Sequence, residues 1–419
     1  MNTSYDRRTL LKLLGLGAGA AGLAACGGEG SPESTAKTDF KVASWSQADP
    51  ASKVGIENLM QAYGKAQKVK VTGVPIAYPD YISQLTLQVK GGQFTGAAQL
   101  DIATLSGFVA LGKLRDLSEQ AKGAGYTETA LTTGQLDGKQ YGLPWTTAAI
   151  GLIANTELLA KADTDKLPET IDEFEALLKK LKAAGTIPYA ASTKVAQLKD
   201  ILIWMETFGA TLIDGDEVTI GDDASVEALT WYKSLLDQKL IAPDVERTDA
   251  RTLFAQGKTA MYDDASVGKD VVIKQAPDKE LVDKIAPFGR PVANSGDKPR
   301  AQQWGHAFIV VDGPGADTAA DFATWATSDT DAAVGYFNDV SLPPTTKSAL
   351  ASDTVAKDTF TTQFSERITA TATPNRFWKF PQYAQMETAV AERVQAALIG
   401  KESPSDALAG ARKAIQDLM

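Results

Sequence analysis

The order of strand and helix patterns between residues 40 and 105 constrains the fold more than any other feature of the sequence. Residues 40–45 alternate between apolar and polar side chains, as a strand does, and residues 69–74 and 100–105 form two further strand patterns. Residues 55–67 and 81–90, which fill the two intervals, carry apolar residues at helical spacing. A β-α-β-α-β order predicts a parallel sheet covered by helices, so we expect an α/β fold.

The alternation restarts after residue 145 and continues toward the end of the chain. Thr170 and Glu173 have the spacing of a capping box at the start of a helix, and Ser405 is expected to cap the last helix. Because 419 residues exceed the usual size of one hydrophobic core, we expect at least two lobes. The predicted helices are 170–183, 198–208, 226–236, 319–327, 331–337, 383–399 and 403–419, and the predicted strands are 150–154, 259–262 and 308–311.

The first 25 residues have the three-part form of an export signal. A basic segment that contains Arg7 and Arg8 precedes an apolar run that is too short for a permanent membrane span and ends in Leu-Ala-Ala-Cys. The paired arginines resemble a twin-arginine (Tat) signal, although the general secretion route stays open. The ending resembles the lipobox of bacterial lipoproteins, in which the peptide is cut before the cysteine and the cysteine is lipidated. We therefore expect a signal peptide over 1–25 and a lipid-anchored flexible linker over 26–38, with Cys26 as the lipidation site.

Charge and rare residues exclude several classes of function. The chain has 42 Lys and Arg against 52 Asp and Glu, a net charge of -10, which disfavours nucleic-acid binding. One His and one Cys exclude an internal disulfide and the multi-histidine and thiolate sites typical of zinc. No G-x-S-x-G elbow and no phosphate-binding loop occurs. We expect no catalytic residue, no metal site and no cofactor.

A series of motifs along residues 39–419 carries a family resemblance. In order they are LDI at 100–102, GKQYGLP at 138–144, NTELL at 155–159, LPETIDEF at 167–174, FAQGKTAM at 254–261, GHAFI at 305–309 and SLPP at 341–344. With them, the chain resembles the extracellular solute-binding lipoproteins of ABC importers, in the carbohydrate cluster that includes the maltose- and oligosaccharide-binding proteins.

The resemblance implies a periplasmic-binding-protein-like fold with two discontinuous lobes. One lobe would comprise residues 39–146 plus 265–325, and the other 147–264 plus 326–419, with a hinge between them and the ligand cleft between the lobes. The lobes would close over the solute, and the loaded form would dock on the transmembrane subunits of an ABC permease.

A sugar site needs flat aromatic faces together with planar groups that bond hydroxyls in pairs. Four tryptophans fall where strands or crossing segments end, so we predict that Trp45, Trp145, Trp304 and Trp378 line the cleft. The alternative for each is packing in a core or at the lobe interface.

Polar candidates follow the same positions. Each of three candidates has an alternative role: a helix cap for Asp80, a core histidine for His306, and a surface ion pair for Arg376. The segment from Trp145 to Ala148 lacks the acidic residue of long-oligosaccharide binders, which favours a smaller sugar or a polyol. The polar and glycine residues predicted to bind ligand are Gln47, Asp80, Tyr81, Ser106, Gly107, Thr146, Asp264, Gly305, His306 and Arg376.

The sequence thus favours a monomeric receptor anchored to the outer face of the cell membrane that binds a sugar or polyol and delivers it to an ABC permease. One alternative is a binding protein for a cationic solute such as a polyamine or betaine, held in an aromatic cage. Another is a secreted carbohydrate-active enzyme, which would need two carboxylates facing each other across the scissile bond.

Overall fold

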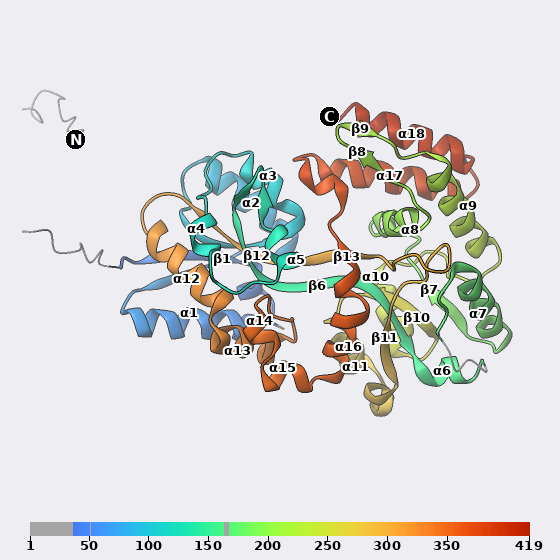
Figure 1. Ribbon diagram of the computed structural model, residues 1–419, viewed down its shortest axis with the longest axis horizontal. Coiled ribbons are helices and arrows are strands. Elements are labelled where there is room, and N and C mark those ends of the chain that lie inside the picture. Colours follow the sequence, from blue (N-terminus) through green and yellow to red (C-terminus); the bar gives the residue numbers. More distant parts are fainter. Residues whose placement is uncertain (1–36, 51, 163–166) are drawn as a thin grey trace, which may run out of the picture. The chain divides into compact units, whose positions relative to one another are not determined.

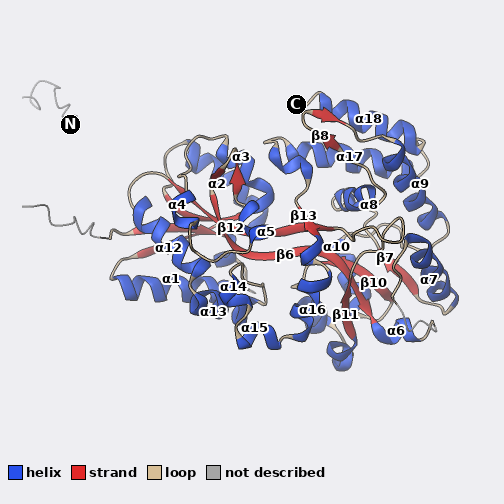
Figure 2. Cartoon of the chain, viewed as in Figure 1, coloured by secondary structure: helices blue, strands red, loops and turns tan. Residues whose placement is uncertain are grey.

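The computed structural model describes residues 37–50, 52–162 and 167–419 (Figure 1). The predicted signal peptide and Cys26 lie outside the described residues. The described part of the chain is a two-lobed α/β fold, as predicted, in which helices surround strands (Figure 2). Within it, no helix combines the length and the apolar character needed to cross a membrane.

The first three strands form the predicted parallel arrangement. Strand β1 (Phe40–Ser44) lies between β2 (Val71–Pro75) and β3 (Gly96–Asp101) and pairs in parallel with both. Helices α1 (Lys53–Gln67) and α2 (Tyr78–Lys90) connect them. The carboxyl ends of β1 and β3 therefore lie at the same edge of the sheet, where ligands of such sheets bind.

The third strand is shorter than the sequence predicted at its carboxyl end. It stops at Asp101, whose side chain accepts a hydrogen bond of 3.0 Å from the backbone N–H of Ala103. This cap begins a 3-10 turn, η2 (Ile102–Thr104), so the predicted strand over 100–105 is wrong beyond Asp101. The turn keeps the Asp101 carboxylate at the end of the strand.

Two long strands connect the strands of the first lobe to those of the second lobe. Strand β12 (Ala301–Val311) pairs antiparallel with β3 and with β6 (Gly142–Asn155). The far half of β6 pairs antiparallel with β10 (Thr259–Asp264) and β11 (Ile285–Phe288) (Figure 1). Only the apolar parts of β6 and β12 had been predicted, because Thr and Gln residues interrupt their hydrophobic pattern.

The remaining strands comprise two further members of this sheet and two separate two-stranded sheets, β4 with β5 and β8 with β9. The other strands are β4 (Gln135–Leu136), β5 (Lys139–Gln140), β7 (Ile187–Ala190), β8 (Ile213–Asp214), β9 (Glu217–Val218) and β13 (Ala372–Thr373). The other helices are α3 (Leu105–Val109), α4 (Ser118–Ala121), α5 (Glu128–Thr132), α6 (Thr156–Ala160), α7 (Ile171–Ala183), α8 (Ile201–Thr207), α9 (Asp223–Asp237), α10 (Arg247–Ala255), α11 (Gly268–Gln275), α12 (Ala316–Ser328), α13 (Thr330–Val340), α14 (Lys347–Leu350), α15 (Asp353–Lys357), α16 (Thr359–Arg367), α17 (Tyr383–Leu398) and α18 (Pro404–Gln416).

Helix caps confirm one prediction and correct another. Thr170 and Glu173 form the predicted capping box at the start of α7. The cap of α18 is Ser403, which accepts a hydrogen bond from the Asp406 N–H at 3.1 Å, and not Ser405. Pro404 occupies the first helical position, where a missing N–H has no cost, so the cap lies two residues earlier than predicted.

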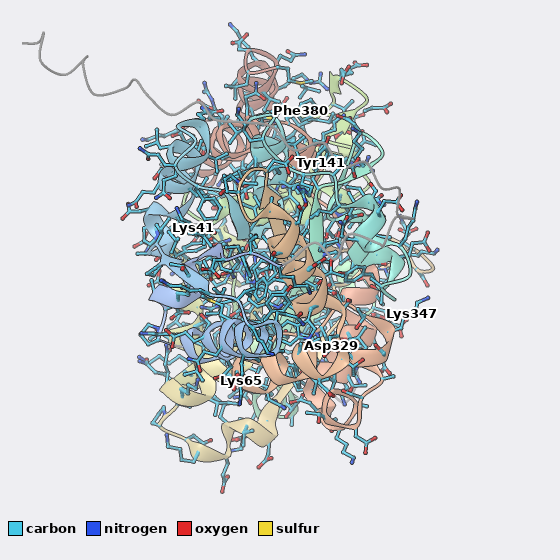
Figure 3. The ribbon with its side chains drawn as sticks, turned by 90° about the vertical axis from the view of Figure 1, so that its left-hand side faces the viewer. Lys41, Lys65, Tyr141, Asp329, Lys347 and Phe380 are labelled. Carbon is cyan, nitrogen blue, oxygen red and sulfur yellow. The ribbon has the colours of Figure 1, made fainter. Side chains whose placement is uncertain are left out.

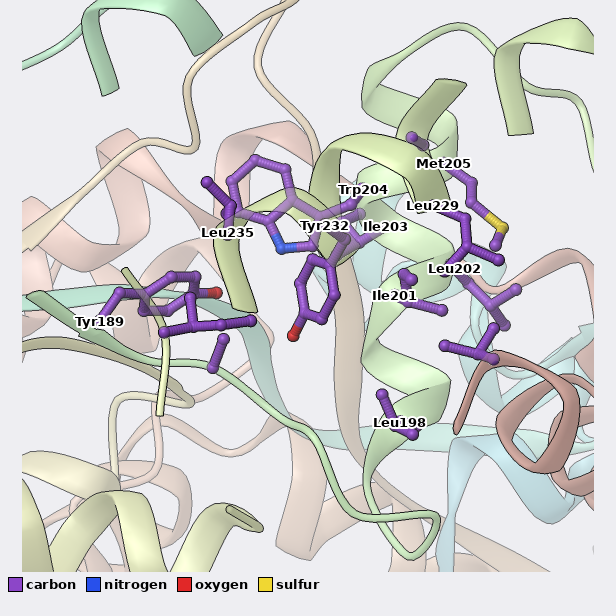
Figure 4. Close-up of a cluster of buried hydrophobic side chains, with 14 of the residues drawn as sticks. Tyr189, Leu198, Ile201, Leu202, Ile203, Trp204, Met205, Leu229, Tyr232 and Leu235 are labelled. Atoms are coloured by element: carbon purple, nitrogen blue, oxygen red, sulfur yellow. The ribbon is translucent and has the colours of Figure 1, made fainter. Parts of the chain in front are cut away.

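Side-chain packing forms separate cores in the two lobes. One core joins residues of 40–145 to residues of 308–336, with Trp145, Phe308 and Tyr336 among its members. A second joins residues of 152–261 to Phe288 and residues of 377–415, and Figure 4 shows part of it around Trp204 and Tyr232. A third cluster joins Ala149 and Ile153 to residues of 245–281 and 360–368. The exact lobe boundaries over 265–325 and 326–419 stay a prediction.

Candidate functional site

Four rings gather where β1 ends and β12 crosses the sheet. His306 lies between Trp45 and Trp304, with ring centroids 5.0 and 4.9 Å away, and Trp45 contacts Tyr78 at 5.6 Å. All three contacts are edge-to-face, the arrangement that aromatic quadrupoles favour. We call Trp45, Tyr78, Trp304 and His306 the aromatic cluster. It brings together three residues predicted to bind ligand.

A carboxylate lies beside the aromatic cluster. Asp101 ends β3, opposite His306 on β12, and is half-buried. Burial raises the pKa of Asp101, while hydrogen bonds from the Ala103 N–H and the Trp304 indole and the charge of Lys199 oppose that rise. The indole of Trp304 is therefore held in place by a charged partner, with its ring still half-exposed.

A second carboxylate comes from the other lobe. Glu387, in the first turns of α17, is 4% exposed and accepts hydrogen bonds of 2.9 Å from Asn375 Nδ2 and Trp378 Nε1. The ammonium of Lys199 lies 3.2 Å from its other oxygen. Trp378 belongs to the 3-10 turn η6 (Arg376–Lys379), and Lys199 to η3 (Leu198–Asp200). Glu387 thus fixes the orientation of the Trp378 ring.

The two carboxylates belong to one electrostatic environment. Burial raises the pKa of Tyr383, on α17, and the charges of Asp101 and Glu387 raise it further. Because the charges of both carboxylates raise the pKa of the same phenol, Asp101 and Glu387 both lie near Tyr383.

A pocket of about 460 Å³ adjoins this region and shares Trp378 with it. At its edge, Ser106 Oγ donates a hydrogen bond of 3.1 Å to the carbonyl of Phe380, so the pocket is closed there by a contact between segments far apart in sequence. This size lies within the range of small-molecule sites. Its lining residues are Ile102, Leu105, Ser106, Thr132, Thr133, Gln135, Leu136, Glu206, Ile213, Gly215, Arg300, Thr373, Pro374, Asn375, Arg376, Trp378 and Lys379.

The sole histidine of the chain is neutral. His306 is 6% exposed, and burial lowers its pKa from 6.5 to about 3. Its Nδ1 lies 3.3 Å from Thr146 Oγ1, so the predicted ligand residue Thr146 serves as the partner of the ring.

This burial predicts a pH dependence of stability. The unfolded chain binds a proton at His306 below pH 6.5, whereas the folded chain does so only near pH 3, so His306 lowers stability as the pH falls through this window. The difference in unfolding free energy between the wild-type protein and His306→Gln should therefore shift by up to about 1.4 kcal/mol per pH unit between pH 6 and 4. Chemical denaturation at a series of pH values measures it, and a constant difference would contradict the buried, neutral histidine.

Comparison with known proteins identifies the family. Residues 58–362, more than half of the chain, match the family model of the bacterial extracellular solute-binding proteins. The chain belongs to this family.

Curated relatives of this solute-binding protein match over part of their length. A protein of Brucella abortus (strain 2308) named as a binding protein is 28% identical over 219 residues, which span 50% of this chain and 53% of the relative. A "probable sugar-binding periplasmic protein" of Mesorhizobium japonicum is 30% identical over 170 residues, 36% of this chain and 38% of the relative. The match therefore spans about half, or less, of each relative.

Solved structures share the fold of this solute-binding protein over most of both chains. The GacH receptor of Streptomyces glaucescens, solved unliganded and with acarbose, superposes with a TM-score of 0.79 at 20% identity, covering 91% of this chain and 98% of the receptor. The cyclic α-maltosyl-1,6-maltose binding protein of Arthrobacter globiformis gives a TM-score of 0.78 at 18% identity, covering 91% and 98%. These similarities confirm the two-lobed architecture.

Four of the residues predicted to bind ligand lie elsewhere in the solute-binding protein or serve its framework. Trp145 is 1% exposed and packs between Phe308 and Tyr336 in the core, with ring centroids at 4.5 and 4.1 Å. Tyr81 is 1% exposed, and its hydroxyl donates to the backbone carbonyls of β1 and β3. Gln47 donates to the Val42 carbonyl at 3.0 Å and packs against Gly73.

Asp264 has a complete set of partners inside its own lobe. The guanidinium of Arg251 donates two hydrogen bonds to it, at 2.7 and 2.9 Å, and Arg247 lies 3.8 Å away. The carboxylate is 1% exposed and does not line the pocket. The carboxylate of Asp264, which was predicted to bind ligand, is therefore saturated by arginines.

The remaining residues predicted to bind ligand lie at the surface, at a close approach of two strands, or in the pocket. Asp80 is exposed in the first turn of α2, and Gly107 is half-buried in α3. A Cβ at Gly305 would come within 2.4 Å of the Thr146 carbonyl oxygen, so this glycine permits the close approach of β12 to β6. Arg376 and Ser106 line the pocket together with Trp378.

Sequence reasoning missed most of the charged residues of the site. Lys199, Glu206 and Glu387 were included in predicted helices but not selected. One signal was present for Glu387, since it lies among Met386, Val390 and Ala391 on a helix face that is otherwise apolar. A charge on a buried face needs a partner, and such residues are often functional. Among the described residues, no group of three His, Cys, Asp or Glu side chains is placed to hold a metal ion.

Proposed function

We propose that this solute-binding protein is the carbohydrate receptor of an ABC importer and that the sugar binds between the aromatic cluster and the Trp378–Glu387 pair. The observation that carries the proposal is the combination of the half-exposed indoles of Trp304 and Trp378 with the half-buried carboxylate of Asp101. Indole faces suit the C–H face of a sugar ring, and planar carboxylate and amide groups suit pairs of hydroxyls. The sugars named for the structurally similar receptors, acarbose and a cyclic maltosyl-maltose, support the same class of ligand.

Binding between the lobes supplies a mechanism for delivery. A ligand that touches Trp304 and Asp101 on one lobe and Trp378 on the other favours the closed arrangement by its contacts with both. In the present structure, the hydrogen bond from Ser106 Oγ to the Phe380 carbonyl links helix α3 to the segment that follows Trp378. We propose that the closed, loaded form is the one that docks on the permease, and that the chain binds its solute without turnover.

A ligand panel tests this function. The mature protein, beginning at Cys26 in unlipidated form, would be melted with neutral mono- to tetrasaccharides, sugar acids, polyols, polyamines, betaine and amino acids. A bound solute at one hundred times its Kd should stabilise the fold by about 2.7 kcal/mol. Stabilisation by a saccharide, with the saccharide recovered unchanged, is the expected result. Stabilisation by polyamines or betaine alone, or conversion of a saccharide to products, would contradict the proposal.

Lipid anchoring is a separate part of the proposal and predicts a change of location. Replacing Cys26 with serine removes the thiol that a lipoprotein signal would modify, so the protein should move from the membrane fraction to the soluble exported fraction. The matched control is Ser31→Ala in the same linker, which should stay with the membrane. Unchanged membrane retention of Cys26→Ser would contradict the anchor without affecting the sugar-binding proposal.

A further inference from the structure

The pocket has the opposite charge to the protein as a whole. The chain carries a net charge of -10, and its described surface mixes both signs, as Lys41, Lys65, Asp329 and Lys347 illustrate in Figure 3. The residues that line the pocket include three cations, Arg300, Arg376 and Lys379, against one carboxylate, Glu206. With all four groups ionised, the lining has a net charge of +2.

Within the described part of the chain, few groups bond to the N–H donors of these cations. The Arg376 guanidinium has one ionic contact, in which Nε lies 3.7 Å from Glu206 Oε1, and its side chain is 52% exposed. Lys379 donates to the Gly215 carbonyl and lies over the Phe380 ring. Across residues 37–419, apart from the undescribed positions 51 and 163–166, no ion pair or hydrogen bond engages the Arg300 side chain. Two guanidinium groups therefore face the pocket with most of their N–H groups uncommitted.

The carboxylates nearby do not satisfy these arginines. Glu206 is 7% exposed, and burial raises its pKa, a rise that Arg300 and Arg376 oppose. Glu387 is committed to Asn375, Trp378 and Lys199, so its charge is already paired. Asp101 accepts hydrogen bonds from the Trp304 indole and the Ala103 N–H. The cation whose charge lowers its pKa is Lys199 and not one of the two arginines.

We propose that Arg300 and Arg376 receive the carboxylate of an acidic saccharide, such as a uronic acid residue, whose sugar ring lies against Trp378. The inference rests on the proposed function and specifies its class of sugar. A guanidinium binds a carboxylate through two parallel N–H···O bonds, which a neutral hydroxyl cannot match. Trp378, which lines this pocket, offers the flat face for the ring. The pocket volume of about 460 Å³ suits one or two sugar units.

Titration calorimetry with matched pairs of sugars tests the inference. The probes are galacturonate with galactose, glucuronate with glucose, mannuronate with mannose, and digalacturonate with galactobiose. We expect at least one acid to bind tenfold or more tightly than its neutral counterpart, with an affinity that falls as salt is raised. Arg376→Gln and Arg300→Gln should each remove most of that preference, by weakening the binding of the acid far more than the binding of its neutral counterpart.

The control and the contrary outcomes separate this inference from the proposed function. Arg393→Gln removes an arginine that pairs with Glu402 outside the pocket, so it should leave both affinities unchanged. Neutral sugars that bind as tightly as the acids, or arginine variants that weaken both alike, would overturn the inference and leave the sugar receptor intact. If no saccharide of the pairs or of the wider panel binds, the proposed function itself fails.

Discussion

Replacing Trp145 with alanine should lower the free energy of unfolding by about 3–5 kcal/mol, the usual cost of truncating a large buried aromatic side chain. The indole is 1% exposed and lies against Phe308 and Tyr336, so its removal leaves a cavity that the core cannot readily fill. Urea denaturation of the unliganded protein measures the loss. Any fall in sugar affinity should be small in the variant that remains folded, because Trp145 does not line the pocket.

A more conservative change provides the control for Trp145. Trp145→Phe keeps a ring in the same cavity and should cost less than half as much stability as Trp145→Ala. If Trp145→Ala instead melts like the wild type and binds sugar poorly, the residue lines the cleft and the placement in the core is wrong.

Replacing Trp304 with alanine should have the reverse pattern. Its ring is half-exposed beside His306, so truncation removes a ligand face more than a core contact. We expect the Kd for the bound saccharide to rise about tenfold to hundredfold, corresponding to a loss of ~1–3 kcal/mol of contact free energy. The unliganded protein should lose clearly less stability than Trp145→Ala does.

The matched control is a half-buried tryptophan outside the site. Trp325 on α12 packs against Tyr63 and Phe322. Trp325→Ala should lower stability without changing the Kd. Equal effects of Trp304→Ala and Trp325→Ala on the Kd would show that affinity follows general stability and not contact with the ligand.

The local parts of the fold could be read from the sequence because they depend on neighbouring residues. The capping box at Thr170 and the β-α-β order near residue 40 are of this kind, and both are confirmed. Trp45, Trp304 and His306 were predicted to share one site, and the structure brings their rings together where β1 ends, although Trp304 and His306 lie within β12 and not at its end.

Trp145 shows why other site residues could not be placed this way. His306 pairs with Thr146 and Ala307 pairs with Pro144, so Trp145 is the extra residue of a bulge in β6. A bulge changes the direction of a side chain, and it arises from pairing with a strand that lies about 160 residues further along the chain. Alternation along β6 alone therefore gives no indication that the indole faces the core.

The charged residues depended on long-range partners in the same way. Asp264 was predicted to bind ligand because it follows the predicted strand over 259–262, yet Arg247 and Arg251 from α10 saturate it. Glu387 looked like an ordinary helix residue, yet Lys199, Asn375 and Trp378 converge on it from other segments. Ion pairs of this kind become visible only once the segments are brought together.

A crystal structure of the mature protein with the saccharide that stabilises it most tests the proposed binding site. We expect electron density for the sugar between the aromatic cluster and Trp378, with a ring face against Trp304 or Trp378 and hydroxyls bonded to Asp101. A saccharide bound away from these residues, for example in the groove beside Gln47 and Met60, would show that the proposed site is wrong.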